Sequence, residues 1–234
     1  MIDYLRRVWH PKASRWIDIS VDAMRLEDAI FWHQYIQPRI RKIGFEEDKA
    51  GLPRSRADHA WNWPTFLIAF APAQRATGRR CQALTINIEG EGRAIPAGML
   101  LLIEDYPWWS RSTLAGRRGS STFAWFLSSA PHAVLKESPL HIPEPPSLGH
   151  ALIDIALVTS LNRGHKGRMW LHASPLGGQR LFDFYVKMGL RAIPEGVRVP
   201  SIRNPLAGIP SDGRYCYTDS KIAKSLTSAL NTNR

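Results

Sequence analysis

The chain has 234 residues, a length that suits one large domain or two small ones. Hydrophobic residues make up 44% and charged residues 22%, values that exclude a disordered, collagen-like or coiled-coil protein. The net charge of +11 favours a phosphate-bearing partner such as a nucleotide cofactor or a nucleic acid, although many soluble proteins are simply basic. The sequence shows neither a membrane-length apolar run nor a secretory signal. We expect a cytoplasmic protein.

The N-terminal third mixes helical and extended patterns. Apolar residues at helical spacing predict a helix over 24–43, which Pro38 should kink or split. A charged loop is expected over 46–56. The apolar run 65–70 has the length of a strand, and Pro72 is expected to end it.

A strand-rich region follows. Leu84, Ile86 and Ile88 alternate with polar residues, which predicts a strand over 83–88. The run 97–103 is apolar throughout, as in a strand buried on both faces. An Arg-, Gly- and Ser-rich stretch at 111–121 indicates a loop, and 122–127 is the next expected strand. Four prolines make 132–147 a long connection.

The stretch 122–189 has the most regular pattern. Apolar residues at helical spacing predict a helix over 148–163, with Gly164 at its C-terminal end. A strand is expected over 168–173, and a second helix carries Leu181, Phe184, Tyr185 and Met188 on one face. Weak strand signals remain at 197–199 and 215–218. The order strand, helix, strand, helix implies a β-α-β crossover and an α/β fold.

Three pieces of this stretch resemble the acetyl-CoA-binding half of the GNAT superfamily of N-acyltransferases. The strand Phe123-Ala-Trp-Phe-Leu127 matches the central strand of that family. The segment Leu148-Gly-His-Ala-Leu152, with the later Arg163-Gly164, matches its pyrophosphate loop and the helix that follows. The segment Phe184-Tyr-Val-Lys-Met-Gly-Leu190 matches its FYxKxGF signature, which is the most specific of the three. The resemblance covers about a third of the chain.

The resemblance implies acetyl-CoA, or a longer acyl-CoA, as co-substrate. A pyrophosphate needs backbone N–H donors at a helix N-terminus with small residues nearby. Backbone groups at the end of the central strand would pair with the amide-bearing arm of CoA, as an added strand does. The implied cofactor-binding residues are therefore Leu127, Ser128 and Ser129 on the strand, together with Leu148, Gly149, His150 and Ala151 at the helix.

The resemblance also implies roles for three site residues. Tyr185 stands where the family has a tyrosine that protonates the leaving CoA thiolate, and its alternative is a packed core tyrosine. Glu104 and Asp105 follow a buried strand where the family often keeps an acidic group that deprotonates the amine, and their alternative is a solvated turn. The chain departs from the family at Pro146, where Arg or Gln is usual, and in the roughly twenty residues between Leu127 and Gly149.

Other polar and aromatic residues admit two interpretations each. His172 is a base or, more simply, a satisfied core histidine, and Trp108 with Trp109 either walls an acceptor site or packs beside a loop. The Arg111, Arg117 and Arg118 loop either contacts phosphate or is solvated. No G-x-S-x-G elbow accompanies Ser128, which disfavours a serine hydrolase. The spacing of Cys81 and Cys216 indicates no metal site.

The sequence thus predicts one GNAT-like α/β domain with a mixed, twisted sheet flanked by helices. Residues 1–80 would form an acceptor-side part, 81–191 the strand-rich and acetyl-CoA-binding core, and 192–234 C-terminal strands and a tail. The predicted function is acetyl transfer to a primary amine by direct attack. The acceptor is a small molecule, a protein or, in a toxin-like alternative, aminoacyl-tRNA. A further alternative is a non-catalytic module that binds CoA or nucleic acid.

Overall fold

The computed structural model describes residues 2–10, 14–43, 56–90, 93–110, 119–136, 148–202 and 208–228. Within this part of the chain, eight strands form one mixed sheet in the order β1-β2-β3-β4-β5-β6-β10-β7. Their bounds are β1 Arg7–His10, β2 Arg15–Ala23, β3 Cys81–Gly90, β4 Arg93–Pro107, β5 Ser120–Ser129, β6 Met169–His172, β7 Arg191–Ala192 and β10 Tyr215–Thr218. Two short strands, β8 (Arg198–Val199) and β9 (Ile209–Pro210), pair separately. The mixed sheet flanked by helices confirms the predicted fold class.

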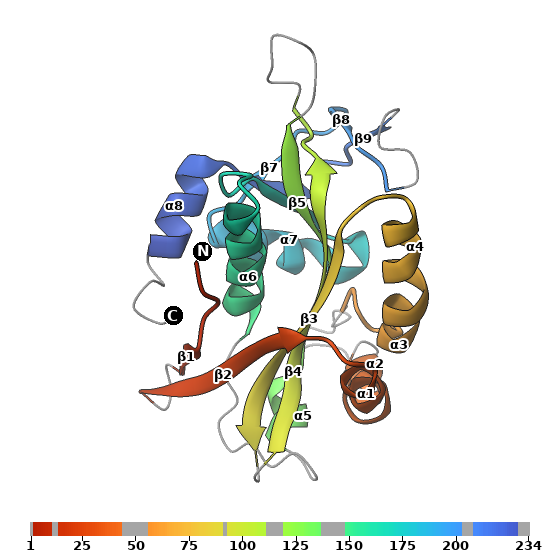
Figure 1. The fold of residues 1–234 in the computed structure, drawn as a ribbon, viewed down its shortest axis with the longest axis vertical. Coiled ribbons are helices and arrows are strands. Elements are labelled where there is room, and N and C mark those ends of the chain that lie inside the picture. Colours follow the sequence, from red (N-terminus) through yellow and green to blue (C-terminus); the bar gives the residue numbers. More distant parts are fainter. Residues whose placement is uncertain are drawn as a thin grey trace.

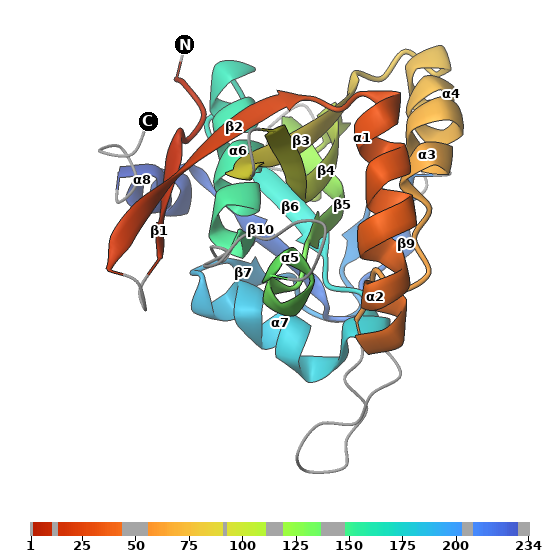
Figure 2. The same cartoon turned by 90° about the horizontal axis from the view of Figure 1, so that it is seen from below.

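The parallel pair of the sheet lies at its centre. β5 runs parallel to β6, and helix α6 (Gly149–Asn162) makes the crossover between them, as predicted. The other neighbouring strands are antiparallel. Helix α6 covers one face of the sheet and α7 (Gly178–Lys187) the other (Figures 1 and 2). The crossover places the N-terminus of α6 at the same end of the sheet as the C-terminus of β5.

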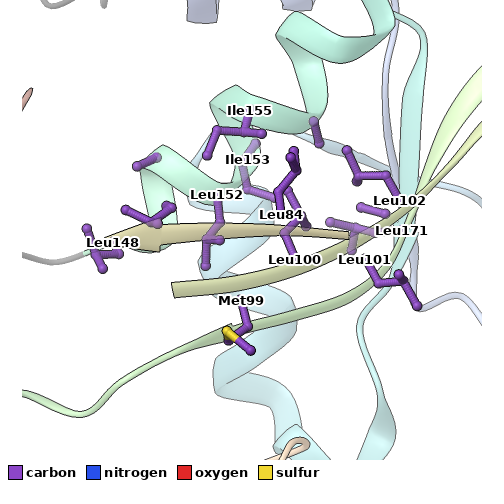
Figure 3. Close-up of a cluster of buried hydrophobic side chains, with 14 of the residues drawn as sticks. Leu84, Met99, Leu100, Leu101, Leu102, Leu148, Leu152, Ile153, Ile155 and Leu171 are labelled. Carbon is purple, nitrogen blue, oxygen red and sulfur yellow. The ribbon is translucent and has the colours of Figure 1, made fainter. Parts of the chain in front are cut away.

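The core lies between α6 and the central strands (Figure 3). Leu100 and Leu102 on β4 and Leu171 on β6 are buried against Leu152 and Ile155 of α6. Almost the whole helix is buried, because the N-terminal segment and α8 (Ser220–Ser228) cover its outer side. The continuous apolar pattern of both α6 and β4 follows from this burial on two sides.

The first predicted helix is present, without the expected break at Pro38. Helices α1 (Leu26–Phe31), η1 (Trp32–Ile36) and α2 (Gln37–Ile43) run on without interruption. The middle piece is a π-helical turn, in which the Gln37 N–H bonds to the carbonyl of Trp32 five residues back. The proline, which has no N–H to donate, is accommodated just after this wider turn.

The strand predicted at 65–70 is wrong, because these residues are helical. Helices α3 (Trp63–Thr65), η2 (Phe66–Phe70) and α4 (Ala71–Ala76) form one continuous rod beside α1. The Asn62 side chain caps its start by accepting from the Thr65 N–H, and Pro64 lies in the first turn, where a missing N–H costs nothing. Pro72 likewise lies at the start of α4 and does not end the helix. So short an apolar run fits the periodicity of a helix and of a strand equally well. Tertiary packing of its aromatic residues stabilises the helix.

The remaining elements are the short helix α5 (His132–Lys136) and the single turn η3 (Pro175–Gly177) before α7. The predicted C-terminal strands correspond to β8 and β10. Most of the proline-rich connection lies outside the described residues, as do Arg111, Arg117 and Arg118. Among the described helices, none combines the length and the apolar character needed to cross a membrane.

Candidate active site

The two edges of β5 are paired very differently. On one side β4 pairs with β5 along nearly its whole length, from Gly98–Ser129 to Pro107–Ser120. On the other side β6 pairs only with Thr122–Ala124. The parallel pair therefore opens after Ala124, and the last residues of β5 have no ladder partner on the β6 side among the described residues.

A β-bulge lies where the two parallel strands separate. In the β4–β5 ladder Leu101 pairs with Phe126 but Leu102 pairs with Ala124, so Trp125 is the extra residue. A bulge bends its strand and increases the local twist, and bulges are frequent next to active sites. The bulge therefore accounts for the early end of the β5–β6 pairing.

The backbone beyond the bulge presents its polar groups to the opening. The Ala130 N–H donates to the Ala97 carbonyl on the β4 side, whereas the Ser129 carbonyl accepts from Arg56, 2.9 Å away, and so points away from β4. Backbone groups of successive residues in a strand alternate between its two edges. Leu127, two residues before Ser129, therefore also directs its N–H and C=O toward the open edge. This edge is able to accept an extended, amide-bearing ligand as an added strand.

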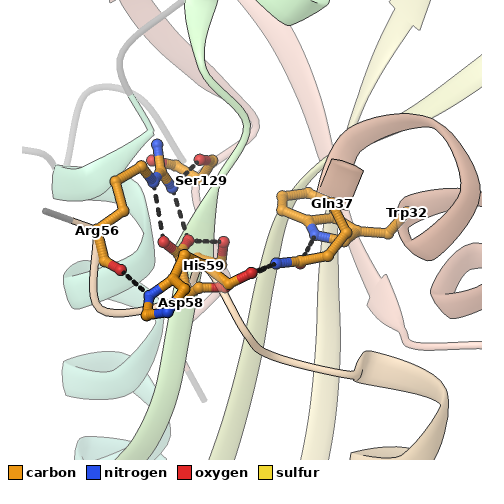
Figure 4. Close-up of polar contacts among 7 residues, drawn as sticks. Trp32, Gln37, Arg56, Asp58, His59 and Ser129 are labelled. Carbon is orange, nitrogen blue, oxygen red and sulfur yellow. Dashed lines mark hydrogen bonds and ion pairs between the residues drawn. The ribbon is translucent and has the colours of Figure 1, made fainter. Parts of the chain in front are cut away.

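A buried polar network fixes the end of β5 (Figure 4). The guanidinium of Arg56 donates to both carboxylate oxygens of Asp58, at 2.8 and 2.6 Å, and the Ser128 hydroxyl also donates to Asp58. Asp58 is only 5% exposed. The loop that carries these residues thus clamps both the side chain of Ser128 and the backbone of Ser129.

The π-helical turn anchors this loop from the other side. The Gln37 amide donates to the backbone carbonyls of Asp58 and His59, at 2.7 and 3.1 Å. The Trp32 indole in turn donates to the Gln37 side-chain oxygen at 3.1 Å (Figure 4). The sequence analysis missed Arg56 and Asp58, because about 70 residues separate them from Ser128 and no local pattern relates the two segments.

The first turn of α6 offers backbone donors at the same end of the sheet. The first bond within the helix is from the Leu152 N–H to the Leu148 carbonyl, so the amides of Gly149, His150 and Ala151 face out of the N-terminus. This turn contains no acidic residue, and His150 is exposed. A Cβ on Gly149 would lie 2.6 Å from the Phe184 ring, so the close approach of this ring to the start of α6 favours glycine here. The donors and the helix dipole together favour an anion.

Tyr185 lies on α7, and its side chain is buried. Burial raises the pKa of the phenol, with Cys216 and Asp58 raising it further. The hydroxyl therefore stays protonated near neutral pH. Asp58, whose charge acts on this phenol, also binds Ser128, and this is the link that the described residues give between Tyr185 and the end of β5.

Glu104 and Asp105 do not belong to this assembly. Six residues of β4 separate Glu104 from Gly98, the partner of Ser129, which corresponds to about 20 Å along the strand. Glu104 is buried and ion-paired with Arg163. Asp105, with a φ of +50°, contacts His165 at 3.0 Å and Arg80 at 3.5 Å. Both carboxylates thus form ion pairs at the other end of the sheet.

The remaining candidates also have local partners. His172 bonds to Asp212 at 2.9 Å. Burial works to raise the pKa of Asp212, but the hydrogen bond from His172 and that from the Arg214 N–H outweigh it and lower the pKa. Trp108 and Trp109 pack on Tyr217, and the Trp108 N–H bonds to Gly119 just before β5, so they do not line the opening. No cluster of three or more His, Cys, Asp or Glu side chains suited to a metal occurs in the described ranges.

Comparison with known proteins finds similarity at the level of structure. No family model matches the chain, and neither does any curated protein. The RimJ structure of Mycobacterium smegmatis, in complex with CoA-disulfide, is 13% identical, with a TM-score of 0.44 over 98% of this chain and 95% of that one. The PaiA N-acetyltransferase of Thermoplasma acidophilum, in complex with coenzyme A, is 11% identical, with a TM-score of 0.42 over 86% of this chain and 97% of that one.

An AtaT toxin mutant bound to the C-terminus of the antitoxin AtaR is also similar, at 11% identity and a TM-score of 0.44 over 89% of this chain and 97% of that one. Features of the chain itself define its fold: a mixed sheet, a parallel β5–α6–β6 unit whose strands separate, and a glycine-containing helix start beside the opening. The chain accordingly has the mixed sheet flanked by helices that its sequence predicts.

Proposed function

We propose that the chain is an N-acyltransferase that transfers an acetyl group from acetyl-CoA to a primary amine. The observation that carries this proposal is the open edge of β5 beyond its bulge, at the same end of the sheet as the α6 N-terminus, and the buried phenol of Tyr185 supports it. A strand edge, an anion-binding helix start and a protonated phenol are the three groups that a CoA thioester needs.

Each group has a separate role. The amides of Gly149, His150 and Ala151 would hold the pyrophosphate. The open edge at Leu127 would pair with the amide-bearing arm, and the Leu127 N–H would stabilise the oxyanion that forms on the thioester carbonyl, while Arg56 holds the Ser129 carbonyl beside it. When bound, acetyl-CoA supplies an acetyl group activated as a thioester.

Tyr185 would act as the general acid. Its proton passes to the departing sulfur, and the proton that the amine loses returns to the phenol through water, so the charge balances over one turnover. Burial keeps the Tyr185 phenol protonated, and the anionic sulfur that develops as the C–S bond breaks would draw its proton. We leave Glu104 and Asp105 out of the reaction, since both are ion-paired, and Glu104 lies about 13 Å along β4 from Leu100, the partner of Leu127.

The proposal extends to the setting of the enzyme. Cys81 and Cys216 are free and buried, which suits a reducing compartment such as the cytoplasm. Residues 1–80 contribute the loop that clamps β5 and would form the acceptor side, while 81–191 would bind acetyl-CoA. Aminoacyl-tRNA as the acceptor, and a module that binds CoA without turnover, are the competing readings.

Calorimetric titration with acetyl-CoA tests the proposal directly. The wild-type chain should bind, and His150→Glu should weaken binding by about tenfold at low salt, because it puts a negative charge beside the pyrophosphate. The effect should shrink at high salt. His150→Gln, which changes the same exposed position without adding charge, should bind within about twofold of wild type.

The titration of the wild-type chain with acetyl-CoA is the decisive measurement for the proposed function. If it does not bind acetyl-CoA, the proposed function is wrong. If it binds acetyl-CoA but transfers acetyl to no amine, the chain is a CoA-binding module. If instead His150→Glu and His150→Gln behave alike, the pyrophosphate lies elsewhere.

A further inference from the structure

Five aromatic side chains form a continuous wall beside the open edge of β5. We define this aromatic wall by its members, Trp61, Phe66, Phe70, Trp125 and Phe126. The rings of Phe66 and Phe126 stack with their centroids 4.0 Å apart, and those of Phe70 and Trp125 stack at 5.8 Å. Trp61 meets the edge of Phe126 at 4.9 Å. The wall therefore joins the loop–α3–η2 segment to β5.

The bulge explains why two consecutive residues of β5 belong to this wall. Successive side chains in a regular strand point to opposite faces of the sheet. Here Trp125 and Phe126 both contact rings of η2, on the same face, because Trp125 is the extra residue of the bulge. Leu127, whose backbone faces the opening, follows directly. The wall thus ends next to the atoms that would hold the thioester carbonyl.

The wall is open to solvent along part of its length. Phe66 is buried, but Phe70 is 39% exposed, and Trp61, Trp125 and Phe126 are half-buried. Stacked rings in a closed core would have no such exposure. Aromatic surface left exposed beside a functional strand edge marks a binding surface.

We propose that the aromatic wall binds the body of the acceptor, and that the acceptor is a small primary amine carried by an aromatic or similarly flat apolar group. This inference rests on the proposed acetyl transfer. The amine nitrogen, after losing a proton to water, attacks the thioester carbonyl. The C–N bond forms and the C–S bond breaks; the sulfur takes the proton of Tyr185, and the second proton that the nitrogen loses returns to the Tyr185 phenolate through water.

The chemistry of the wall suits a single amine on an apolar body. The described carboxylate at this end of β5, Asp58, already accepts from Arg56 and Ser128. Aromatic faces attract one ammonium group by cation–π interaction while they bury an apolar body, and they need no carboxylate to do so.

Steady-state kinetics with two amines tests the assignment, with 2-phenylethylamine as the aromatic probe and spermidine as the polycation. The wild type should acetylate 2-phenylethylamine with a kcat/KM at least tenfold higher than for spermidine. Phe70→Leu and Trp125→Leu should each raise the KM for 2-phenylethylamine about three- to tenfold, because each removes a stacking partner. Their kcat and their affinity for acetyl-CoA should stay near wild type.

Trp16→Leu is the matched control, because Trp16 is also an exposed tryptophan, 42% exposed, but pairs with Trp9 on the β1–β2 hairpin. It should change neither KM. Calorimetry with 2-phenylethylamine in the presence of saturating CoA gives a readout that does not depend on turnover.

A preference for spermidine, or no calorimetric binding of 2-phenylethylamine to the CoA-saturated protein, would overturn the substrate class while acetyl-CoA binding still supported the proposed function. Salt-dependent binding of RNA at the wall, lost in Trp125→Leu, would overturn it as well. Failure to bind acetyl-CoA would overturn the proposed function and, with it, this inference.

Discussion

The two ends of β5 use polar groups in opposite ways. At the start of the strand, charged side chains pair with one another: the buried Glu104 with Arg163, and the exposed Asp105 with His165 and Arg80. At the far end, side chains clamp the strand, the Leu127 amide faces the open edge, and the first turn of α6 leaves its amides without helix partners. The comparison teaches that a buried carboxylate already paired with arginine is a structural group, whereas backbone groups left without a strand partner mark a site.

We call the end of β5 near Ser129 the open end and the end near Ser120 the closed end. The largest expected effect comes from a variant that changes the open end alone. Tyr185→Phe keeps the packed ring but removes the proton donor, so turnover should fall by about 10² to 10⁴. The melting temperature and the acetyl-CoA affinity should stay nearly unchanged. Tyr217→Phe is the control at the closed end, where Tyr217 packs on Trp108 and Trp109. Normal turnover of a less stable Tyr185→Phe variant would show that Tyr185 is only a core residue.

Two buried serines on β5 sharpen the comparison, since each lies at a different end. Ser128 donates to Asp58 at the open end, and Ser121 donates to the Tyr106 carbonyl at the closed end while accepting from Trp170. Each serine-to-alanine change should cost about 1–3 kcal/mol of unfolding free energy in urea. Ser128→Ala alone should also weaken acetyl-CoA binding, because it loosens the clamp on the strand edge. Equal effects of the two variants on binding would contradict the proposed clamp.

The Glu104 carboxylate, at the closed end, should contribute to stability and not to turnover, and its effect should be smaller. Glu104→Gln removes the charge that pairs with Arg163, whose side chain is 36% exposed and can be rehydrated. We expect a loss of about 1–2 kcal/mol in unfolding free energy. Acetyl-CoA affinity and turnover, measured per folded molecule, should not change. A variant of normal stability with little turnover would restore Glu104 as the base that the resemblance implied.

The smallest expected effect is a pH dependence of stability at the closed end. Burial lowers the pKa of His165 below its ordinary value of 6.5; Asp105 opposes this shift and Arg168 adds to it. The folded chain therefore holds fewer protons than the unfolded chain just below pH 6.5, so stability should fall as the pH drops through this range. His165→Gln should flatten the dependence of the urea midpoint on pH between 7 and 5.5. Parallel curves for the two proteins would show that His165 makes no such contribution.

Local patterns in the sequence predicted the central fold because its periodicity is strong. The apolar run of β4, the helical spacing of α6 and α7 and the glycine after each helix were sufficient to place the β-α-β unit. The run at 65–70 failed because six apolar residues fit a strand as well as a helix. The helix forms there because Asn62 caps its start and because Phe66 packs against Phe126 of β5.

The candidate site could be predicted only in part, because sequence patterns reveal only residues that lie close together along the chain. Motif residues such as Gly149 and Tyr185 lie within one continuous stretch, so their order along the chain reveals them. Glu104 and Asp105 also lie near that stretch, but the antiparallel register carries them to the other end of the sheet. Arg56 and Asp58 show no motif at all, and only the folded loop brings them to Ser128.

The sequence by itself determined the elements of the core, because helix and strand periods are set by which side chains must be buried together. It also determined the family resemblance, because the signature residues are contiguous. Tertiary structure alone decided where the parallel strands separate. That separation arises from one extra residue, Trp125, between ladder pairs whose partners are 22 and 25 residues apart, and no local interaction fixes such a register.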